Sequence, residues 1–460
     1  MDLHANRAQG KVIGRTDSSA YYMILNCYSC FLVLVRRLLL QQPINRCGCR
    51  GRSCRHAAPK AFSLTLGKRV PLWNSYLFTV ALLCGCAHRL ATGPQDAFRE
   101  VAPPVLSDDL SLSGLNDAIK AQSHVLEAKS SELIEVGPVA IPRGEYATAL
   151  ERLSRVLDSN VSESAKLSYI ADNFRFFEFA GGEKPGRVLL TGYFEPILQG
   201  SKSKTSRFSR PLYRKPDDLV SVGLHAFSER FKDEKPLKAR VEAFKVVPYY
   251  SRAEIDGKGS LAGRGLELAW VDPIDAFFLH IQGSGTVIWP DGHEQHLVYS
   301  DKNGHMYQAI GKFLKGTIAP HPVTMPRIER VLRSMSSQER DRVLFLNPSY
   351  VFFSPSQRRA ITSMGIPATP GRTIAVDPRF APKGALSYMI FQKPLFRSDG
   401  VKSDDPISFS EAARFVLDQD SGGAITGTGR VDLFWGRGDE AKRHAGVMQH
   451  PARIMYLIPR

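Results

Sequence analysis

The sequence predicts a mainly β protein with helices in the N-terminal part of its body. Between positions 115 and 179, apolar residues recur at three- and four-residue spacing, the period of an amphipathic helix. From Arg187 onward, short apolar runs alternate with turns that contain Gly or Pro, a pattern typical of short strands. The C-terminal part is again strand-rich and includes a glycine-dense segment at 419–440. A chain of 460 residues has room for two or three domains.

The helical region is interpreted as packing, and no chemistry is assigned to it. A polar, Pro-bearing tether at 87–104 precedes it. Helices are expected at 115–128, 146–157 and 165–179, after the motif at 302–305 through positions 310 and 314, and near 328–335; strands are expected at 188–196, 266–273, 276–285, 373–378 and 387–391.

The segment 419–440 is interpreted as a glycine-punctuated hairpin with two carboxylates, Asp420 near its start and Asp432 on its second strand. Glycines in such numbers favour positive-φ turns or close approach of a ligand to the backbone. Side chains then alternate, which predicts a core face and an open face with an acid in a carbohydrate cleft. The alternative is that Asp432 is a solvated charge at a sheet edge. The expected core face holds Val431, Leu433 and Trp435, and the open face holds Arg430, Asp432 and Phe434.

Positive charge and cysteine are concentrated at the N-terminus. Residues 1–85 contain twelve Lys or Arg against two Asp or Glu, so they supply +10 of the net charge of +16. The remaining body is mildly basic, which suits an exported protein near an anionic polymer or a membrane surface. All seven cysteines lie in the first 86 residues, and the pair Cys27 and Cys30 lacks the second half of a zinc motif. Because no P-loop, dinucleotide, zincin or nucleic-acid motif is present, those functions are not expected.

The segment 66–86 has the order of a secretory signal peptide. Two basic residues precede the apolar run 76–83, and small residues follow it. Its ending, Leu-Cys-Gly-Cys, resembles a bacterial lipoprotein box in which Cys86 is lipidated, with Cys84 where Ser or Ala is commoner. An ordinary cleaved signal peptide or an uncleaved anchor is the alternative, although the apolar run is short for a membrane span.

Residues 1–65 do not fit this export signal. They hold a second apolar run, which two arginines interrupt, and a stretch rich in Cys and Arg. No methionine occurs between Met23 and Met306. We therefore expect translation to start at a non-Met codon near Leu66 or Val70, and residues 1–65 to be an artefact of gene prediction or a disordered extension.

Six motifs follow one another in order along residues 187–460. They are Thr-Gly-Tyr-Phe-Glu-Pro at 191–196, His-Ile-Gln-Gly-Ser-Gly at 280–285, Lys-Asn-Gly-His at 302–305 with Ile-Gly at 310–311, Asn-Pro-Ser-Tyr-Val-Phe-Phe at 347–353, Arg-Thr-Ile-Ala-Val-Asp-Pro at 372–378, and Gln-Asp-Ser-Gly-Gly-Ala-Ile at 419–425 through Asp-Leu-Phe-Trp-Gly at 432–436. Together they resemble the membrane-bound lytic transglycosylase A family with its C-terminal three-aspartate (3D) domain. Any one motif is weak, but six in order are specific.

This resemblance implies a fold and a reaction. The fold is a double-psi β-barrel domain made of residues 105–190 and 355–460, with a smaller β-barrel domain, residues 191–354, inserted to bind substrate and a groove between them. The reaction is cleavage of the β-1,4 bond between N-acetylmuramic acid and N-acetylglucosamine in peptidoglycan, with a 1,6-anhydromuramic end as product. The implied location is the periplasmic face of the outer membrane of a Gram-negative bacterium, with a lipid anchor.

The resemblance also implies partners and site residues. The partners are peptidoglycan glycan strands and the outer membrane, with cell-wall synthesis or division proteins as further candidates; no nucleic acid, metal or cofactor is expected. By motif position the catalytic acid falls on Asp432. Asp377 and Asp420 match the other two aspartates of the domain, and we interpret them as barrel-organising or substrate-contacting residues.

One carboxyl group suffices for this chemistry. Hydrolytic glycosidases need two carboxylates, whereas the C6 hydroxyl of muramic acid is an internal nucleophile that replaces the second carboxylate and the water. Asp432 would donate a proton to the glycosidic oxygen and then take one from O6. It must start protonated, so we expect burial beside Phe434 and Trp435 to raise its pKa. The Arg430 guanidinium is expected to point elsewhere, to Asp420 or to a substrate carboxylate.

Other motif residues are expected to form the walls of the cleft. Aromatic rings could stack on sugars, and small polar groups and glycines could contact acetamido and hydroxyl groups; turn formation is the alternative for each. Glu195 is expected to be a solvated charge at the end of a strand. His444 and His450 are expected to be structural histidines. A hydrolase that pairs Asp432 with Glu195 or Asp420, and a wall-binding module without activity, are the rival functions. The expected wall residues are Tyr193, Phe194, Trp289, Thr191, Gln282, Ser284, Gly422 and Gly423.

Overall fold

The computed structural model describes residues 91–460 except 183, 233, 360, 398–402 and 404. The predicted signal peptide with Cys86, the predicted extension and the first residues of the predicted tether lie outside this part of the chain. Within it, no helix is long and apolar enough to cross a membrane.

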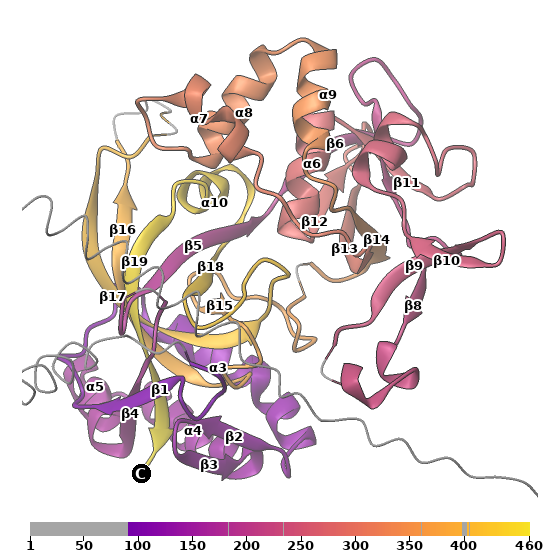
Figure 1. The fold of residues 1–460 in the computed structure, drawn as a ribbon. Helices are drawn as coiled ribbons and strands as arrows, with labels where there is room; N and C mark the ends of the chain where they lie inside the picture. Colours follow the sequence, from indigo (N-terminus) through magenta and orange to yellow (C-terminus); the bar gives the residue numbers. More distant parts are fainter. Residues whose placement is uncertain (1–90, 183, 233, 360, 398–402, 404) are drawn as a thin grey trace, which may run out of the picture. The chain divides into compact units, whose positions relative to one another are not determined.

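Six strands close into a ring (Figure 1). The ring closes because one strand, β19, pairs with β16 along one part of its length and with β5 along another. The neighbours β5–β18 and β15–β17 are parallel, and the other pairs are antiparallel. Closure gives each of these strands a partner on both sides. In ring order the strands are β5 (Val188–Glu195), β18 (Arg430–Arg437), β15 (Thr373–Ala375), β17 (Ser408–Asp420), β16 (Leu386–Leu395) and β19 (Gln449–Pro459).

The strands on either side of the glycine-dense segment are not a hairpin. β15 lies between β17 and β18, parallel to the first and antiparallel to the second. The hairpin prediction is therefore wrong, because a strand from an earlier part of the chain fills the place that local alternation assigned to a direct pairing. The alternation along β18 itself is confirmed: Val431 and Leu433 are fully buried in the barrel core.

Three helices cover the barrel core, α3 (Leu112–Ala128), α4 (Arg143–Asp158) and α5 (Glu163–Asn173). Serine side chains cap α3 and α5 by accepting backbone amide hydrogen bonds at their first turns. The predicted helix 165–179 is too long, because its aromatic end forms β4 (Phe174–Phe179), which pairs with β19. The small strands beside these helices are β1 (Phe98–Val101), β2 (Leu133–Val136) and β3 (Val139–Pro142).

The chain between β5 and β15 builds a second sheet of six strands. The mainly β prediction is thus confirmed in both parts, and the strands expected at 188–196 and 266–273 correspond to β5 and β11. In sheet order the strands are β14 (Val351–Ser356), β13 (Glu294–Lys302), β12 (Gly285–Ile288), β6 (Ile197–Ser201), β11 (Glu267–Val271) and β7 (Arg210–Tyr213). A separate three-stranded sheet contains β8 (Val220–Val222), β9 (Leu237–Glu242) and β10 (Lys245–Pro248).

The strand predicted at 276–285 is instead helix α6 (Pro273–Gln282). Asp272 caps it by accepting hydrogen bonds from two backbone amides, Pro273 occupies its first position, and Gly283 ends it in the left-handed conformation, with φ 84°. These are strong start and stop signals for a helix. The prediction was wrong because the run between them is apolar on every face and shows no period that separates helix from strand.

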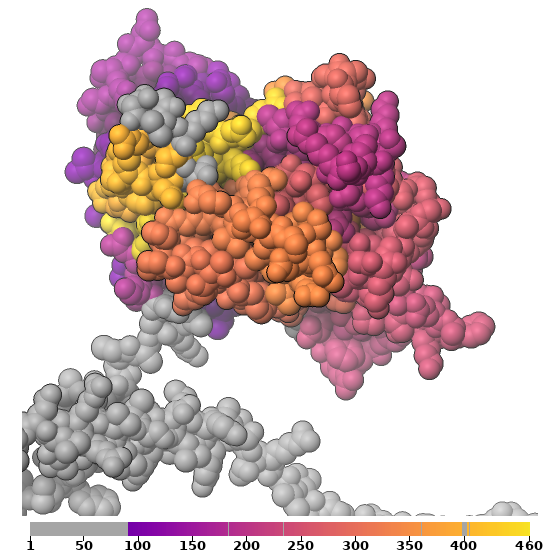
Figure 2. Space-filling view, turned by 90° about the horizontal axis from the view of Figure 1, so that it is seen from above, coloured from indigo at the N-terminus to yellow at the C-terminus, as the bar shows by residue number. Residues whose placement is uncertain are grey.

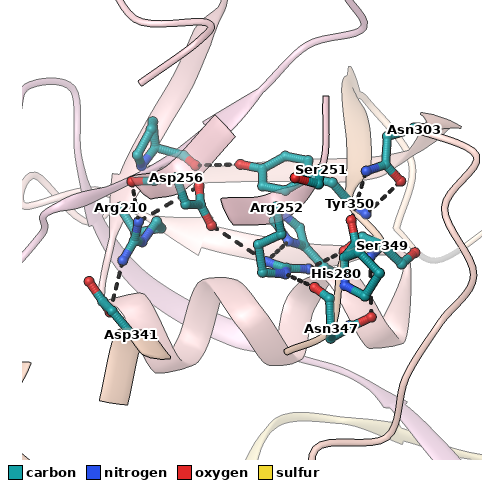
Figure 3. A network of polar contacts seen from close by, with 12 residues as sticks. Arg210, Ser251, Arg252, Asp256, His280, Asn303, Asp341, Asn347, Ser349 and Tyr350 are labelled. Carbon is teal, nitrogen blue, oxygen red and sulfur yellow. Dashed lines mark hydrogen bonds and ion pairs between the residues drawn. The ribbon is translucent and has the colours of Figure 1, made fainter. Parts of the chain in front are cut away.

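A buried arginine joins α6 to the segment before β14 (Figure 3). Arg252 is 1% exposed and donates hydrogen bonds to His280 Nδ1 on α6 at 2.9 Å and to the carbonyl oxygens of Asn347 and Ser349 at 3.2 and 2.7 Å. An ion pair with Asp256 at 3.6 Å balances its charge. Because a buried charge is costly unless it is paired and hydrogen-bonded, this network fixes α6 tightly.

Helices α7 (Gly311–Ile318), α8 (Met325–Ser334) and α9 (Ser337–Phe345) form an orange layer that Figure 2 shows beside the yellow C-terminal strands. This layer meets α10 (Gly438–Ala445), which follows β18. The amide of Met325 donates to the carbonyl of Gly446 at 3.1 Å, and Lys442 pairs with Glu329 at 2.7 Å. The inserted segment is therefore attached to the barrel at α8 and α10.

Gly192 lets β5 pass closely beneath α10. A Cβ atom at this position would lie 2.7 Å from the Cα of Ala445 and 2.9 Å from Cδ1 of Trp435. Trp435 stacks on His444 at 4.8 Å and packs against the barrel core, so neither neighbour is free to move. The glycine is required here for space.

We expect Gly192→Ala to lower the free energy of unfolding by about 1–3 kcal/mol, since it overpacks a filled contact. Gly316→Ala is the matched control, because Gly316 lies inside α7 and a Cβ added there would have no described atom within 4 Å; it is expected to be neutral or stabilising. Urea unfolding of both variants measures the effect, and equal stability of the two would contradict the packing argument.

Candidate active site

The register of the barrel places two aspartates in one row. Ala375 of β15 is paired with Asp420 of β17 on one side and with Asp432 of β18 on the other. Asp432 is in turn paired with Thr191 of β5. The two carboxylates are therefore two strand spacings apart, about 10 Å between backbones.

The row faces away from the barrel interior. Leu190, Val431 and Leu433, the neighbours of the row along their strands, are buried in the barrel core. Because side chains alternate along a strand, Asp432 and Thr191 point to the opposite side. Phe434 and Tyr193 follow on that side, and their rings lie 5.1 Å apart. The predicted second face of β18 thus exists and carries an acid and an aromatic ring, but it is not open at the ring, because Phe434 is 3% exposed.

The surroundings of Asp432 raise the pKa of its carboxyl group and so favour the protonated form. Burial raises its pKa to about 6, while the charge of Arg430 and the hydroxyl of Thr191 act in the opposite direction and Asp420 adds a smaller increase. Among the described residues, its Oδ1 atom is buried without a hydrogen-bond partner. The prediction of a raised pKa is confirmed, and the interpretation of Asp432 as a solvated edge charge is wrong.

As expected, Arg430 does not pair with the carboxyl group of Asp432, and no oxygen of that group lies within 4.0 Å of its guanidinium. Its guanidinium donates to the hydroxyl of Thr191 at 3.4–3.5 Å and to the carbonyl of Ala424 at 3.2 Å. The guanidinium makes no ion pair with Asp420, so the first of its two expected partners, Asp420 and a substrate carboxylate, is wrong. Its charge still reaches Asp432, because it is the largest influence that lowers the pKa of that group.

Asp420 is already saturated with hydrogen bonds. The Tyr193 hydroxyl donates to its Oδ2 at 2.9 Å, and the amides of Ser363 and Ser421 donate to its Oδ1 at 2.9 and 2.8 Å. Burial raises its pKa against these bonds, and burial together with the charge of Asp420 raises the pKa of Tyr193 well above its ordinary value. Asp420 therefore positions Tyr193 and the start of the glycine-dense loop.

Asp377 organises the other end of that loop. Its Oδ2 accepts a hydrogen bond from the amide of Gly427 at 2.7 Å and pairs with Arg379 at 2.6 Å. Burial alone would raise the pKa of Asp377, but the Arg379 guanidinium and the Gly427 amide outweigh it and lower the pKa. Gly427 has φ +74°, which glycine adopts without strain.

A half-buried lysine, Lys383, that the sequence did not reveal joins these elements. Lys383 donates to the carboxylate of Asp418, which is completely buried, and to the backbone carbonyls of Val376 and Asp420. Tyr456 donates to the other oxygen of Asp418 at 2.8 Å. Lys383 thereby fixes the end of β17 beside β15. Lys383 and Asp418 do not belong to a motif whose chemistry we recognised, so no signal in the sequence pointed to this ion pair.

The remaining predicted wall residues have mixed outcomes. Gln282 accepts a hydrogen bond from the amide of Phe194 at 3.0 Å, so it links α6 to β5 beside Tyr193. Ser284 is half-buried just beyond α6. Gly422 and Gly423 are exposed on the loop after Asp420.

Two of the predicted stacking surfaces are wrong. Phe194 is 4% exposed and packs against α10, and Trp289 is 7% exposed in the core of the second sheet. Glu195 is also buried, with the Thr286 hydroxyl donating to it at 2.7 Å, so it is not a solvated charge. The alternation of side chains along a strand shows which residues share a face, but it does not show whether that face lines a cleft or packs against another element.

The two histidines pack on aromatic rings. His444 stacks on Trp435, and His450 lies 4.0 Å from the ring of Phe409. Burial lowers the pKa of both, which fits structural histidines. In the part of the chain that the structure describes, no group of three or more His, Cys, Asp or Glu side chains is arranged to hold a metal ion.

Family models match two segments of this chain. The MltA specific insert domain matches residues 189–354, and the 3D domain matches residues 372–458. A protein of Vibrio cholerae named membrane-bound lytic murein transglycosylase A is 28% identical over 387 residues, covering 83% of this chain and 93% of the relative. The Escherichia coli K12 protein of the same name is 26% identical over 402 residues, covering 84% and 96%.

Solved structures have a similar fold. The crystal structure of a membrane-bound lytic murein transglycosylase from Agrobacterium tumefaciens matches with a TM-score of 0.63 and 28% identity, covering 79% of this chain and 98% of the other. An E. coli MltA structure with bound chitohexaose matches with a TM-score of 0.59 at 23% identity, covering 81% and 97%. The second likeness concerns the fold alone.

The raised pKa of Asp432 predicts a stability difference that depends on pH. Its folded pKa is about 6 against an ordinary value of 3.8, so the folded state binds more protons and loses stability as pH rises between these values. We expect Asp432→Asn to be more stable than the wild type at pH 7 by roughly 2–3 kcal/mol, and this gain to vanish near pH 4.

Urea unfolding at both pH values measures the difference. Asp439→Asn, which neutralises an exposed aspartate on α10, serves as the control and is expected to differ little from the wild type at either pH. A gain for Asp432→Asn that is the same at pH 4 and pH 7 would show that the carboxyl group is not held protonated by burial.

Proposed function

Because the chain belongs to the membrane-bound lytic transglycosylase A family, we propose that it is a lytic murein transglycosylase. It would cleave the β-1,4 bond between N-acetylmuramic acid and N-acetylglucosamine and leave a 1,6-anhydromuramic end. The observation that carries this proposal is the Asp432 carboxyl group, which faces outward from the barrel with a pKa raised to about 6. Such a group is a proton donor near neutral pH that becomes a base once it has donated.

The proposed reaction uses Asp432 twice. The protonated carboxyl donates its proton to the bridging glycosidic oxygen, and the bond from that oxygen to C1 of the muramoyl ring breaks. The C6 hydroxyl of the same ring attacks C1, and the Asp432 carboxylate takes the hydroxyl proton. No water is consumed, and the acid is restored. The internal nucleophile has a high effective molarity, so a second carboxylate is not required.

The surroundings of the other carboxylates favour a single acid. The oxygens of Asp420 accept three hydrogen bonds, and Asp377 is paired with Arg379. The backbones of Asp420 and Asp432 lie two strand spacings apart along the row, about 10 Å. Glu195 is buried against Thr286. These environments support positioning roles for Asp420, Asp377 and Glu195 and weigh against hydrolysis by a carboxylate pair.

The proposal extends to the architecture. We interpret the six-stranded ring as the double-psi barrel of this family and residues 191–354 as an inserted substrate-binding domain, with the glycan strand between them. Thr191, Tyr193 and Gln282 would line the side of β5 that carries the row. The relatives are named membrane-bound, which agrees with lipidation at Cys86 and a site on the periplasmic face of the outer membrane.

Replacing the acid tests the proposed reaction. Asp432→Asn is expected to lower the release of 1,6-anhydro muropeptides from purified sacculi by at least about 10³-fold, because the amide can neither donate nor accept the proton. Mass spectrometry of the digest measures both product and end type. Asp439→Asn, on the exposed face of α10, should keep full activity. Substantial activity of Asp432→Asn, or reducing muramic ends from the wild type, would refute the proposal.

The acid also predicts a pH dependence. Because the protonated form is the donor, kcat/KM should fall as pH rises through the pKa of Asp432 in the free enzyme, about 6. Arg430 is the largest influence lowering that pKa, so Arg430→Met should move the falling limb to higher pH. Lys245→Met, which removes an exposed charge on β10, is the control. A limb that stays in place in Arg430→Met would contradict the assignment of the limb to Asp432.

A further inference from the structure

Two cations from different parts of the chain meet at the glycine-dense loop. The Nζ atom of Lys302, at the end of β13, lies 3.4 Å from where a Cβ of Gly423 would stand. The guanidinium of Arg430, at the start of β18, donates to the carbonyl of Ala424 at 3.2 Å. Since 423 and 424 are consecutive, both cations sit against the same stretch of loop.

Neither cation has a carboxylate partner among the described residues. Within that part of the chain, no carboxylate oxygen lies within 4.0 Å of the Lys302 ammonium or the Arg430 guanidinium. The nearest acid in sequence, Asp301, is already paired with Lys215 and Lys238 at 3.0 and 2.8 Å. Both cations are half-buried. Because charges that are partly removed from water normally pair, this arrangement favours an anion from outside the chain.

The backbone that carries Lys302 is rigid. The next residue, Asn303, is 1% exposed; its side chain donates to the carbonyls of Tyr250 and Pro348 at 2.9 and 2.8 Å and accepts from the amide of Tyr350 at 2.9 Å (Figure 3). Lys302 therefore extends from a fixed strand end toward the loop. A preorganised cation loses less entropy when it binds a ligand than one on a mobile segment.

The place of the pair relative to Asp432 identifies the ligand group. Arg430 precedes Asp432 by two residues on the same face of β18, so an anion held there lies close to the bond being cleaved. Tyr307, which follows Lys302 on the inserted segment, is also near enough to feel the charge of Arg430. In peptidoglycan the muramoyl residue carries acidic groups, either its own lactyl carboxylate or those of the attached peptide.

We propose that Lys302 and Arg430 form a binding site for a carboxylate of the muramoyl residue at the scissile bond, and so make the enzyme selective for acidic glycans. This inference rests on the proposed function, because it assumes a peptidoglycan substrate. Arg430 presents a planar fork that matches a carboxylate, and Lys302 adds a second charge next to Gly423 on the same loop. The ligand class is a carboxylate carried by an amino-sugar polymer.

Binding to the full chain with Asp432→Asn, which should not cleave its ligand, tests the site. The probes are glycan strands stripped of peptide, with free lactyl carboxylates, and the same strands after amidation with methylamine. Acidic strands should bind about tenfold more tightly than amidated ones, as expected for a charge-assisted contact. Adding Lys302→Gln should remove most of this preference, Lys302→Arg should retain it, and Lys245→Gln should leave it intact.

A second pair of probes, peptide-bearing strands with and without amidated peptide carboxylates, identifies the source of the carboxylate. A preference that depends on Lys302 only in stripped strands assigns the lactyl group, and one only in peptide-bearing strands assigns the peptide; either supports the site. Equal binding of acidic and amidated strands in both sets, or a preference that Lys302→Gln leaves unchanged, overturns it. Binding is measured without cleavage, so a negative result here refutes only the carboxylate site. The proposed reaction is refuted by a different result, the absence of anhydro products from the wild-type enzyme.

Discussion

The insertion of β15 between β17 and β18 is the constraint on which the site depends. It separates Asp420 from Asp432 by one strand and sets both in a single row that faces out of the barrel. If β17 and β18 paired directly, the two carboxylates would be adjacent and would repel each other as neighbouring ionised groups. The intervening strand gives each aspartate its own surroundings, and the closed ring prevents the register from slipping.

The three aspartates Asp377, Asp420 and Asp432 have different surroundings and therefore different properties. Asp377 is ionised beside a guanidinium, Asp420 is fixed by three donors, and Asp432 is half-buried with a buried Oδ1 atom that has no partner in the described chain. Burial raises the pKa of Asp420 as well, but donors occupy both of its oxygens, whereas Oδ1 of Asp432 has no donor among the described residues. The raised pKa of Asp432 also costs stability, since the removal of a carboxylate from water disfavours the folded state whenever the group is ionised. The rigid contacts of Lys383 at the end of β17 help to hold the strands around this site in place.

Much of this arrangement followed from the sequence, and the exceptions share a physical cause. The alternation along β18 predicted which side of the strand carries Asp432, because that pattern depends on near neighbours alone. The place of β15 and the burial of Phe194 and Trp289 depend on strands that are distant in sequence, so no local period could reveal them. Helix α6 was missed although Asp272 and Gly283 marked its ends; its uniformly apolar run obscured the period.

The charge of Arg430 works against the proposed reaction in the free protein, because a cation near Asp432 opposes the protonation that this reaction needs. A bound substrate carboxylate, as proposed above, would remove this conflict. An anion held by Arg430 and Lys302 would offset the guanidinium field at Asp432 and add a negative charge of its own, and both effects favour the protonated acid. Asp432 would then be most fully protonated when an acidic glycan is in place. Under the two proposals, Arg430 would link recognition of the substrate to protonation of the proposed acid, and this would explain why a cation stands two residues from a carboxyl group that has to be protonated at the start of the reaction.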